Sequence, residues 1–208
     1  MNKYIAEFIG TFFLVLTIGC TVILSGAGVV PPLAIGAALM VMIFAGGHIS
    51  GAHYNPAVTL GVWIRGRIPM ADVIPYWVAQ ILGACLAALA VSYLHGGEAV
   101  KAASVNSGHA ALAELLYTFA LVYVVLNVAT AKANAGNSFY GLAIGFTVMV
   151  GAFAVGGVSG GAFNPAVAVG ISVMGLAAWS KLWIYLIANF AGGAAAGLTF
   201  KFLNSADK

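Results

Sequence analysis

Charged residues are scarce in this chain. Only 6% of its 208 residues are Asp, Glu, Lys or Arg, whereas a soluble globular domain contains about 25%. Hydrophobic residues make up 62% of the chain. This balance excludes a soluble domain and predicts a protein that crosses the lipid bilayer several times. The net charge of +3 is too small and too scattered to indicate a nucleic-acid partner.

Cysteine is also rare, since the chain has only two. Cys20 and Cys85 both fall inside apolar runs, so we expect buried free thiols and neither a disulfide nor a metal site. The sequence shows no pairing of a nucleophile with a base, no cluster of metal ligands and no phosphate-binding loop. We therefore expect no enzymatic activity and no cofactor.

Long apolar runs are abundant by contrast. Six of them are long enough to cross a hydrocarbon core of about 30 Å. They cover approximately residues 4–25, 32–48, 73–95, 109–131, 139–156 and 182–203. Two shorter apolar segments, 55–64 and 164–173, would reach only about halfway. The connections are short, with a Gly/Pro-marked linker near residues 26–32, so we expect one domain over residues 1–208.

Each short segment begins with the same three residues. The two triplets are Asn55-Pro56-Ala57 and Asn164-Pro165-Ala166. Asn is a favoured residue just before a helix and Pro is favoured at its first position, so each triplet predicts the start of a half-helix. Two half-helices that meet head to head at their Asn residues would together make one span. That geometry predicts a pore.

The two halves of the chain, about 1–98 and 107–208, repeat one another. Ala34-Ile35-Gly36 precedes the first triplet at the same distance as Ala143-Ile144-Gly145 precedes the second. Because three spans per half is an odd number, the second half must insert with the opposite topology. Inverted repeats with broken helices are typical of membrane proteins that hold a solute near the bilayer midplane.

The distribution of Lys and Arg predicts the orientation. With the N-terminus inside, six basic residues face the cytoplasm and two face outward. The six are Lys3, Arg65, Arg67, Lys132, Lys201 and Lys208, and the two are Lys101 and Lys181. We therefore expect both termini in the cytoplasm. The compact form without long tails is typical of a prokaryotic protein, which predicts the plasma (inner) membrane.

Taken together, these motifs resemble the major intrinsic protein family, the aquaporins and their relatives. The resemblance covers nearly the whole chain and rests on both triplets, on Ala6-Glu7-Phe8-x-Gly10-Thr11, on His48-Ile49-Ser50-Gly51 and on Glu114. It implies an all-α membrane protein with six transmembrane helices, two re-entrant half-helices and an hourglass pore. It also implies a homotetramer with a pore in each monomer.

The pore centre is expected at Asn55 and Asn164. Each side-chain amide would donate a hydrogen bond to a passing water or hydroxyl group, and the two helix N-termini would place partial positive charge at the same depth, which opposes cations and proton transfer. Carbonyl groups of residues 49–54 and 158–163 would form a row of acceptors. Gly51, Gly160 and Gly161 would permit the unusual backbone there.

Glu7 and Glu114 are acids inside apolar segments, which makes each a functional candidate. One reading is a proton relay. The other, implied by the resemblance, is a scaffold in which each carboxylate accepts backbone N–H bonds from its re-entrant loop. His48 is expected to line the cytoplasmic half of the pore, and a role in pH sensing stays open for His48 and His53. Their spacing of five and the lack of nearby carboxylates or thiols predict no metal site.

Four positions would form the selectivity filter by the resemblance: Ile35, Ala152, Gly161 and Val167. Water-selective relatives present there an aromatic residue, a His, a small polar or Cys residue and an Arg, so Val167 stands in place of the Arg. At Ala152 a shift of one residue would bring Gly151 or Phe153 instead. An apolar filter without a cation predicts a wider opening that passes water and small uncharged solutes, such as urea-, glycerol-, ammonia- or peroxide-like molecules. Because no Cys lies near these four positions, we expect mercurials to inhibit conduction only weakly.

Two other classes of protein stay open at this point. A coupled secondary transporter also uses inverted repeats and broken helices, but it needs ionisable groups at the midplane, where only Glu7 and Glu114 are available. A structural membrane protein with little permeability is the other alternative, although the short loops offer little adhesive surface.

Overall fold

The computed structural model describes residues 1–24 and 28–207 and is all-helical in these ranges. The long helices are α1 (Asn2–Val22), α2 (Pro31–Ser50), α4 (Met70–Leu94), α5 (Ser107–Val125), α6 (Tyr140–Ser159) and α8 (Leu182–Leu203). The short helices are α3 (Pro56–Arg65) and α7 (Pro165–Val173). A π-helical turn, η1 (Leu126–Thr130), extends α5, and two short 3₁₀ turns cover Lys132–Asn134 and Trp179–Lys181.

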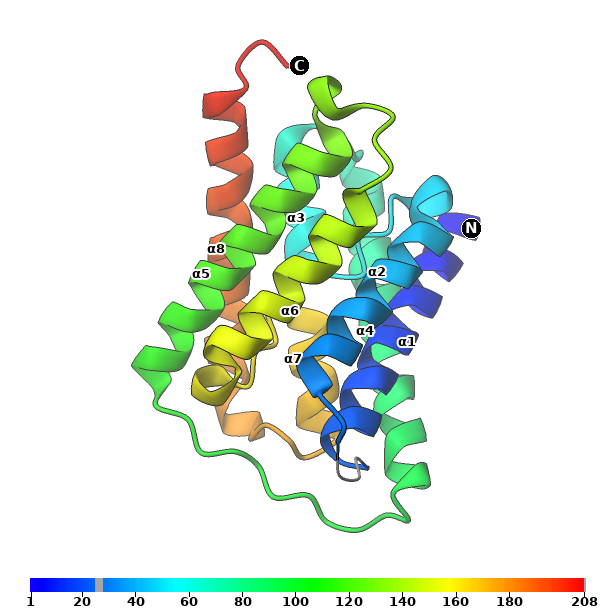
Figure 1. Cartoon of the computed structure of the whole chain (residues 1–208), viewed down its shortest axis with the longest axis vertical. Coiled ribbons are helices and arrows are strands. Elements are labelled where there is room, and N and C mark those ends of the chain that lie inside the picture. The colour runs from blue at the N-terminus through cyan, green and yellow to red at the C-terminus, as the bar shows by residue number, and fades with distance from the viewer. Residues whose placement is uncertain (25–27, 208) are drawn as a thin grey trace.

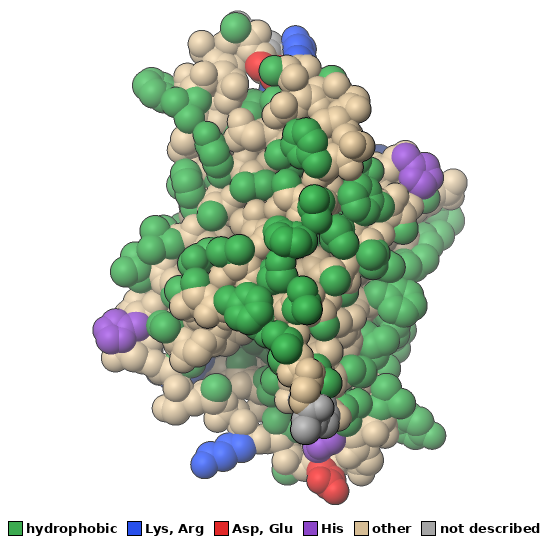
Figure 2. All heavy atoms as spheres, viewed as in Figure 1, with side chains coloured by type: hydrophobic (Ala, Val, Ile, Leu, Met, Phe, Trp, Pro, Cys, Tyr) green, Lys and Arg blue, Asp and Glu red, His purple; other side chains and the backbone are tan. Residues whose placement is uncertain are grey.

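Six of these helices are long and apolar enough to cross a membrane. Figure 1 shows them as a bundle, with the ends of the chain toward the top of the view and the long connection from α4 to α5 at the bottom. Figure 2 shows hydrophobic side chains over the middle of one face and most charged side chains near the two ends. The predicted fold class is confirmed: six membrane-spanning helices with two half-helices between them.

The helix ends differ from the predicted ones at two informative places. The second and fifth predicted spans ended at residues 48 and 156, but α2 and α6 continue to Ser50 and Ser159. Each helix ends where Gly51 or Gly160 adopts a left-handed conformation, with φ of 84° and 92°, which is the usual way for Gly to terminate a helix. The small residues before each Gly were predicted to be extended, but they continue the helix. Residues 26 and 27 of the linker predicted at 26–32 and the basic residue Lys208 lie outside the described residues, and α2 already begins at Pro31.

The same order of elements occurs twice: long, long, short, long. The order α1, α2, α3, α4 is followed by α5, α6, α7, α8. The two halves contact each other where α2 crosses α6, at Gly36 and Gly145. A Cβ atom on Gly145 would lie 2.5 Å from the carbonyl oxygen of Gly36, and one on Gly36 would lie 2.7 Å from that of Gly145. The two backbones approach this closely only because neither residue has a side chain.

Candidate functional site

The two short helices are capped in the same way. Asn55 precedes α3 in an extended conformation, and its side-chain oxygen accepts a hydrogen bond from the N–H of Ala57 at 2.8 Å. Asn164 precedes α7, and its oxygen accepts from the N–H of Ala166 at 2.9 Å. A cap of this kind typically stabilises a helix by about 1 kcal/mol. The Asn-Pro-Ala triplets therefore begin both half-helices as the sequence predicts.

The same two Asn residues also hold the half-helices together. The side-chain nitrogen of Asn55 donates to the carbonyl oxygen of Phe163 at 2.9 Å, and that of Asn164 donates to the carbonyl oxygen of Tyr54 at 2.8 Å. An amide NH₂ group carries two hydrogens. Each Asn thus uses one hydrogen to fix its partner loop, and among the described residues the other has no protein acceptor. This reciprocal pairing was not anticipated from the sequence.

Glu7 organises the loop before the first triplet. Its Oε1 atom accepts hydrogen bonds from the Ser50 hydroxyl at 2.7 Å and the His53 N–H at 2.9 Å. Its Oε2 atom accepts from the Tyr54 N–H at 2.6 Å and the Gln80 amide at 2.8 Å. Four donors converge on one buried carboxylate, which satisfies backbone groups that neither lipid nor helix could satisfy.

Glu114 does the same for the loop before the second triplet. It accepts from the Ser159 hydroxyl at 2.7 Å and from the N–H groups of Ala162 at 2.9 Å and Phe163 at 2.7 Å. The two acids therefore lie behind the loops as acceptors of structural hydrogen bonds. This geometry favours the scaffold reading over a proton relay, and it leaves a coupled transporter without a free acid at the midplane.

The loop backbones are strained outside the glycines as well. Ala52, Tyr54 and Phe163 have φ values of 51°, 50° and 49°, a region that residues with a side chain rarely adopt. Such strain persists only where the surroundings over-determine the conformation. Here the carboxylates of Glu7 and Glu114 do so, because they bind the N–H groups on this strained backbone.

The row of acceptor carbonyls is shorter than predicted. Residues 49–50 and 158–159 are helical, and the carbonyls of Ser50 and Ser159 accept from the hydroxyls of Tyr76 and Tyr185. The carbonyls at residues 54 and 163 accept from the two Asn side chains. Within the described ranges, the carbonyl oxygens of residues 51–53 and 160–162 accept no hydrogen bond from protein groups. Three acceptors in each half are thus left without a donor among the described residues.

Two cavities run beside these loops. The narrow cavity has a volume of about 70 Å³, room for only a few water molecules. The wide vestibule has a volume of about 900 Å³ and is lined by residues near the chain ends, such as Lys3 and Lys132. The cavities share the lining residues Ile43, His53, Val125 and Ile144. The two cavities therefore adjoin each other at these four residues.

The predicted site residues divide into three groups. Those that line the narrow cavity are Asn55, Asn164, Gly160 and the four proposed filter residues Ile35, Ala152, Gly161 and Val167. His48 and Gly51 line the wide vestibule. Glu7, Glu114 and the Pro and Ala residues of the triplets line neither of these two cavities. Phe153, the alternative to Ala152, is exposed on the outer surface, and Cys20 and Cys85 line neither cavity.

The orientation of His53 is set by Thr59 and Gln80, which were not predicted as site residues. The Thr59 hydroxyl donates to the carbonyl oxygen of Asn55 at 3.1 Å and accepts from the amide of Gln80 at 3.1 Å. The Nδ1 atom of His53 lies 3.0 Å from this hydroxyl, so in the neutral ring Nδ1 is the protonated nitrogen and donates. The Nε2 atom is then an acceptor available to the path where the two cavities meet.

The internal repeat could have identified some of the residues that were not predicted. Tyr76 and Tyr185 follow the first and second triplets at the same spacing. Aligning the halves on their triplets would therefore have identified this pair. The same alignment places Ala162 and Ala168 at the positions of His53 and Thr59, so it gives no sign of a polar pair that belongs to one half alone.

Six spans, two half-helices that meet at paired Asn side chains and a narrow path beside them define a membrane channel built as an inverted repeat. The model of the family described as "Major intrinsic protein" matches residues 1–200. The chain therefore belongs to the major intrinsic protein family, as its motifs indicated. Members of this family are channels and not enzymes.

Relatives and a solved structure agree with this assignment. The chain is 37% identical over 217 residues to "Glycerol uptake facilitator protein-like 6" of Lactiplantibacillus plantarum, with both chains covered completely. It is 34% identical over 219 residues to "Probable aquaporin NIP4-2" of Arabidopsis thaliana, covering 100% of this chain and 76% of that one. The fold is similar to that of the aquaglyceroporin from Plasmodium falciparum, with a TM-score of 0.82 and 24% identity over 99% of this chain and 97% of that one.

Proposed function

We propose that this chain is a passive channel for water and small uncharged solutes that excludes ions and protons. The observation that carries the proposal is the narrow cavity, which adjoins the wide vestibule and has Asn55 and Asn164 in its wall. The named relatives, a glycerol uptake facilitator-like protein and a probable aquaporin, support this class of solute.

The path offers a solute both donors and acceptors. Asn55 and Asn164 each have one amide hydrogen free, and the carbonyls of residues 51–53 and 160–162 accept on either side of them. The remaining wall is mostly aliphatic, with side chains such as Leu39 and Ile171. A molecule that exchanges its water shell for these few groups crosses at low cost, whereas an ion has no counter-charge to replace its hydration. The positive ends of α3 and α7 oppose cations further.

Selectivity is proposed to reside in Ile35, Ala152, Gly161 and Val167. All four line the narrow cavity, and none of their side chains carries a hydrogen-bonding group or a charge. With Val at position 167 in place of a cation, the cavity excludes less by size and offers no fixed donor there. Such a filter favours compact neutral solutes that need few hydrogen bonds, alongside water.

The proposal is tested in liposomes by stopped-flow light scattering under sucrose, urea and glycerol gradients. We expect the wild type to conduct water and at least one solute, and Val167→Arg to reduce the solute flux strongly. Val167→Met adds comparable length without charge and serves as the control for bulk. Water flux without solute flux, unchanged by Val167→Arg, would place the filter elsewhere. No flux at all would favour the structural alternative.

Assembly and orientation are proposed on separate grounds. A homotetramer is supported by family membership and by the exposed apolar side chains on the long helices. Cytoplasmic termini are supported by the excess of Lys and Arg near the wide vestibule, which would then face the cytoplasm. A prokaryotic plasma membrane is supported by the bacterial relative that matches over its whole length. The single channel domain with repeats near 1–98 and 107–208 is supported by the doubled order of elements.

A further inference from the structure

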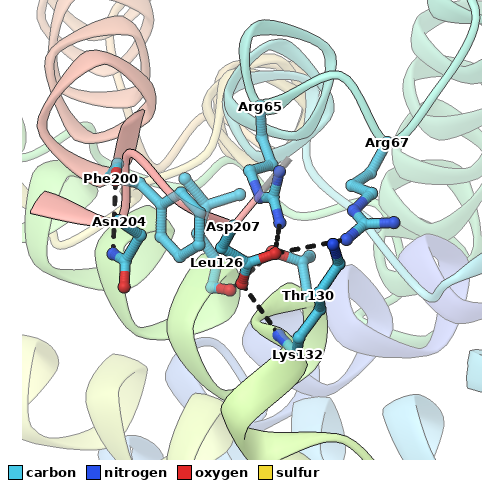
Figure 3. A network of polar contacts seen from close by, with 8 residues as sticks. All are labelled: Arg65, Arg67, Leu126, Thr130, Lys132, Phe200, Asn204 and Asp207. Carbon is cyan, nitrogen blue, oxygen red and sulfur yellow. Dashed lines mark hydrogen bonds and ion pairs between the residues drawn. The ribbon is translucent and has the colours of Figure 1, made fainter. Parts of the chain in front are cut away.

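The carboxylate of Asp207 joins three separate parts of the chain. Asp207 lies in the short segment after α8, and Figure 3 shows it between Arg65, Arg67 and Lys132. Its Oδ1 atom lies 2.7 Å from the Nη2 atom of Arg65 and 3.5 Å from that of Arg67. Its Oδ2 atom accepts a hydrogen bond from the N–H of Lys132 at 2.8 Å. One carboxylate therefore connects the end of α3, the turn after it and the segment after η1.

The Arg65 side chain is a buried cation, so its contact with Asp207 matters for the stability of this region. It is the last residue of α3, and its side chain is only 3% exposed, while that of Asp207 is 14% exposed. Its guanidinium group lies over the ring of Phe200, 4.6 Å from the ring centre. A positive charge at a helix C-terminus is favourable, but a buried cation also needs a counter-ion, and removing one member of a buried pair leaves the other uncompensated. Asp207 is that counter-ion.

The position of Arg65 couples it to the pore centre. α3 runs from Pro56 to Arg65, so Asn55 lies at one end of a ten-residue helix and the ion pair of Arg65 with Asp207 at the other. Backbone hydrogen bonds join the two ends of this ten-residue helix, which are about 15 Å apart. A displacement of its Arg65 end is therefore transmitted to Asn55, whose amide lies 2.9 Å from the Phe163 carbonyl.

Asp207 also contacts residues that line the wide vestibule. Arg67 and Lys132 both line this cavity, and both interact with Asp207. The segment that begins at Lys132 is held by Asn134, which donates to the carbonyl of Asn127, and by Asn137, which donates to the carbonyl of Val128. Those bonds connect the segment to η1, and Asp207 connects it to the end of α3.

The inverted repeat does not require this ion pair. Counted from Asn164, the residue that takes the place of Arg65 in the second half is Met174, which is buried among apolar side chains. An apolar residue thus suffices to end a half-helix in this fold. The ion pair is a feature of the first half-helix alone, and it depends on a residue that lies outside the repeated elements.

We propose that Asp207 is a positioning residue for conduction, which fixes α3, and through it Asn55, by neutralising the buried Arg65. Without the carboxylate, the Arg65 guanidinium moves toward water in the vestibule and draws the end of α3 with it. The Asn55 amide then loses its fixed place opposite Phe163, and the pore centre is no longer held in the geometry that conducts. This inference rests on the proposed channel function.

The test compares Asp207→Ala with wild type in liposomes, with permeabilities divided by the amount of folded channel. We expect water permeability to fall by a factor of about 2 to 30, the range found when residues along a coupling network are changed. The flux of the solute that the wild type conducts best, urea or glycerol, should fall more than that of water, because a larger molecule depends more on a fixed geometry. Glu98→Gln removes one exposed acid far from α3 and is the control.

A second variant tests whether the effect passes through Arg65. In Arg65→Met/Asp207→Ala the buried charge is absent and the half-helix ends as the second one does, so permeability should return toward the wild-type value. If Asp207→Ala does not fold, Asp207→Asn, which keeps the shape but not the charge, takes its place. Unchanged permeability in the single variant, or equal loss in the single and double variants, would overturn the proposal. A wild type without flux would instead overturn the channel function on which the proposal rests.

Discussion

At the scale of single residues, the site is built by a few polar groups that each serve two partners. Asn55 and Asn164 cap their own helices and donate to the opposite loop. Glu7 and Glu114 use both carboxylate oxygens to hold the strained backbone in place. Because these groups are buried, each unsatisfied bond would be costly, and the loops have little freedom to rearrange.

Glu114→Gln should destabilise the folded channel. Three donors converge on the two carboxylate oxygens of Glu114, whereas an amide offers one oxygen and turns its NH₂ group toward another donor. A buried unsatisfied group costs about 1–3 kcal/mol, which corresponds to a fall of roughly 2–12 °C in Tm for a protein of this size. Thermal unfolding in detergent measures this fall in Tm. The same change at the exposed Glu98 is the control, and equal Tm values for both variants would contradict the scaffold role.

At the scale of elements, the half-helices depend on how closely the long helices pack. α2 and α6 cross at Gly36 and Gly145 without intervening side chains. Ile35 and Ile144, the neighbours of these glycines, both line the narrow cavity. The separation of the two helices at this crossing therefore contributes directly to the width of the path.

Gly145→Ala should separate α2 from α6. The added methyl group would lie 2.5 Å from the carbonyl oxygen of Gly36, which belongs to the backbone and cannot turn away. Overpacking of this kind costs about 1–3 kcal/mol. Gly156→Ala lies on the same helix and meets nothing within 4 Å, so it should gain up to about 1 kcal/mol from helix propensity. We thus expect Gly145→Ala to lower Tm and Gly156→Ala to raise it. A stabilised Gly145→Ala variant would show that the crossing tolerates a side chain.

At the scale of the whole molecule, charged side chains line the wide vestibule but not the narrow cavity. Apolar side chains cover the outside of the bundle, while Lys3, Arg67 and Lys132 line the wide vestibule at one end. Asp207 lies at that end, outside the membrane-spanning helices. Its hydrogen bond from the Lys132 N–H and the nearby Arg65 guanidinium hold the pKa of its carboxyl below the ordinary value of 3.8.

The stability difference between wild type and Asp207→Asn should therefore depend on pH only in acid. A lowered pKa means that the ionised form is favoured in the folded state, so its stabilisation is complete above the ordinary pKa and is lost as the pH falls through the folded one. The groups that face Asp207 are Arg65, Arg67 and Lys132, which stay charged throughout. We expect a constant difference in Tm from about pH 8 to about pH 5 and a shrinking one below about pH 4. A difference that already shrinks at neutral pH would contradict this assignment.

Much of the fold could be predicted from the sequence. The lengths of the apolar runs determined the six spans because a bilayer core sets the length of a helix that crosses it. The two Asn-Pro-Ala triplets located the starts of α3 and α7 because capping is a local property of the chain. The scarcity of charge made Glu7 and Glu114 stand out as buried acids. These features depend on composition, or on residues close together in the sequence.

Only the tertiary structure decided which distant groups meet. The Asn55 amide reaches the carbonyl of Phe163 across the repeat, and Thr59 and Gln80 together orient His53. Asp207 and Arg65 are 142 positions apart in the chain, yet they form one partly buried ion pair. No local pattern records such contacts, because their energy depends on desolvation and on distances that exist only after the helices have packed. The sequence by itself thus determined that this protein is a membrane channel with two half-helices, and tertiary packing decided what holds those half-helices in place.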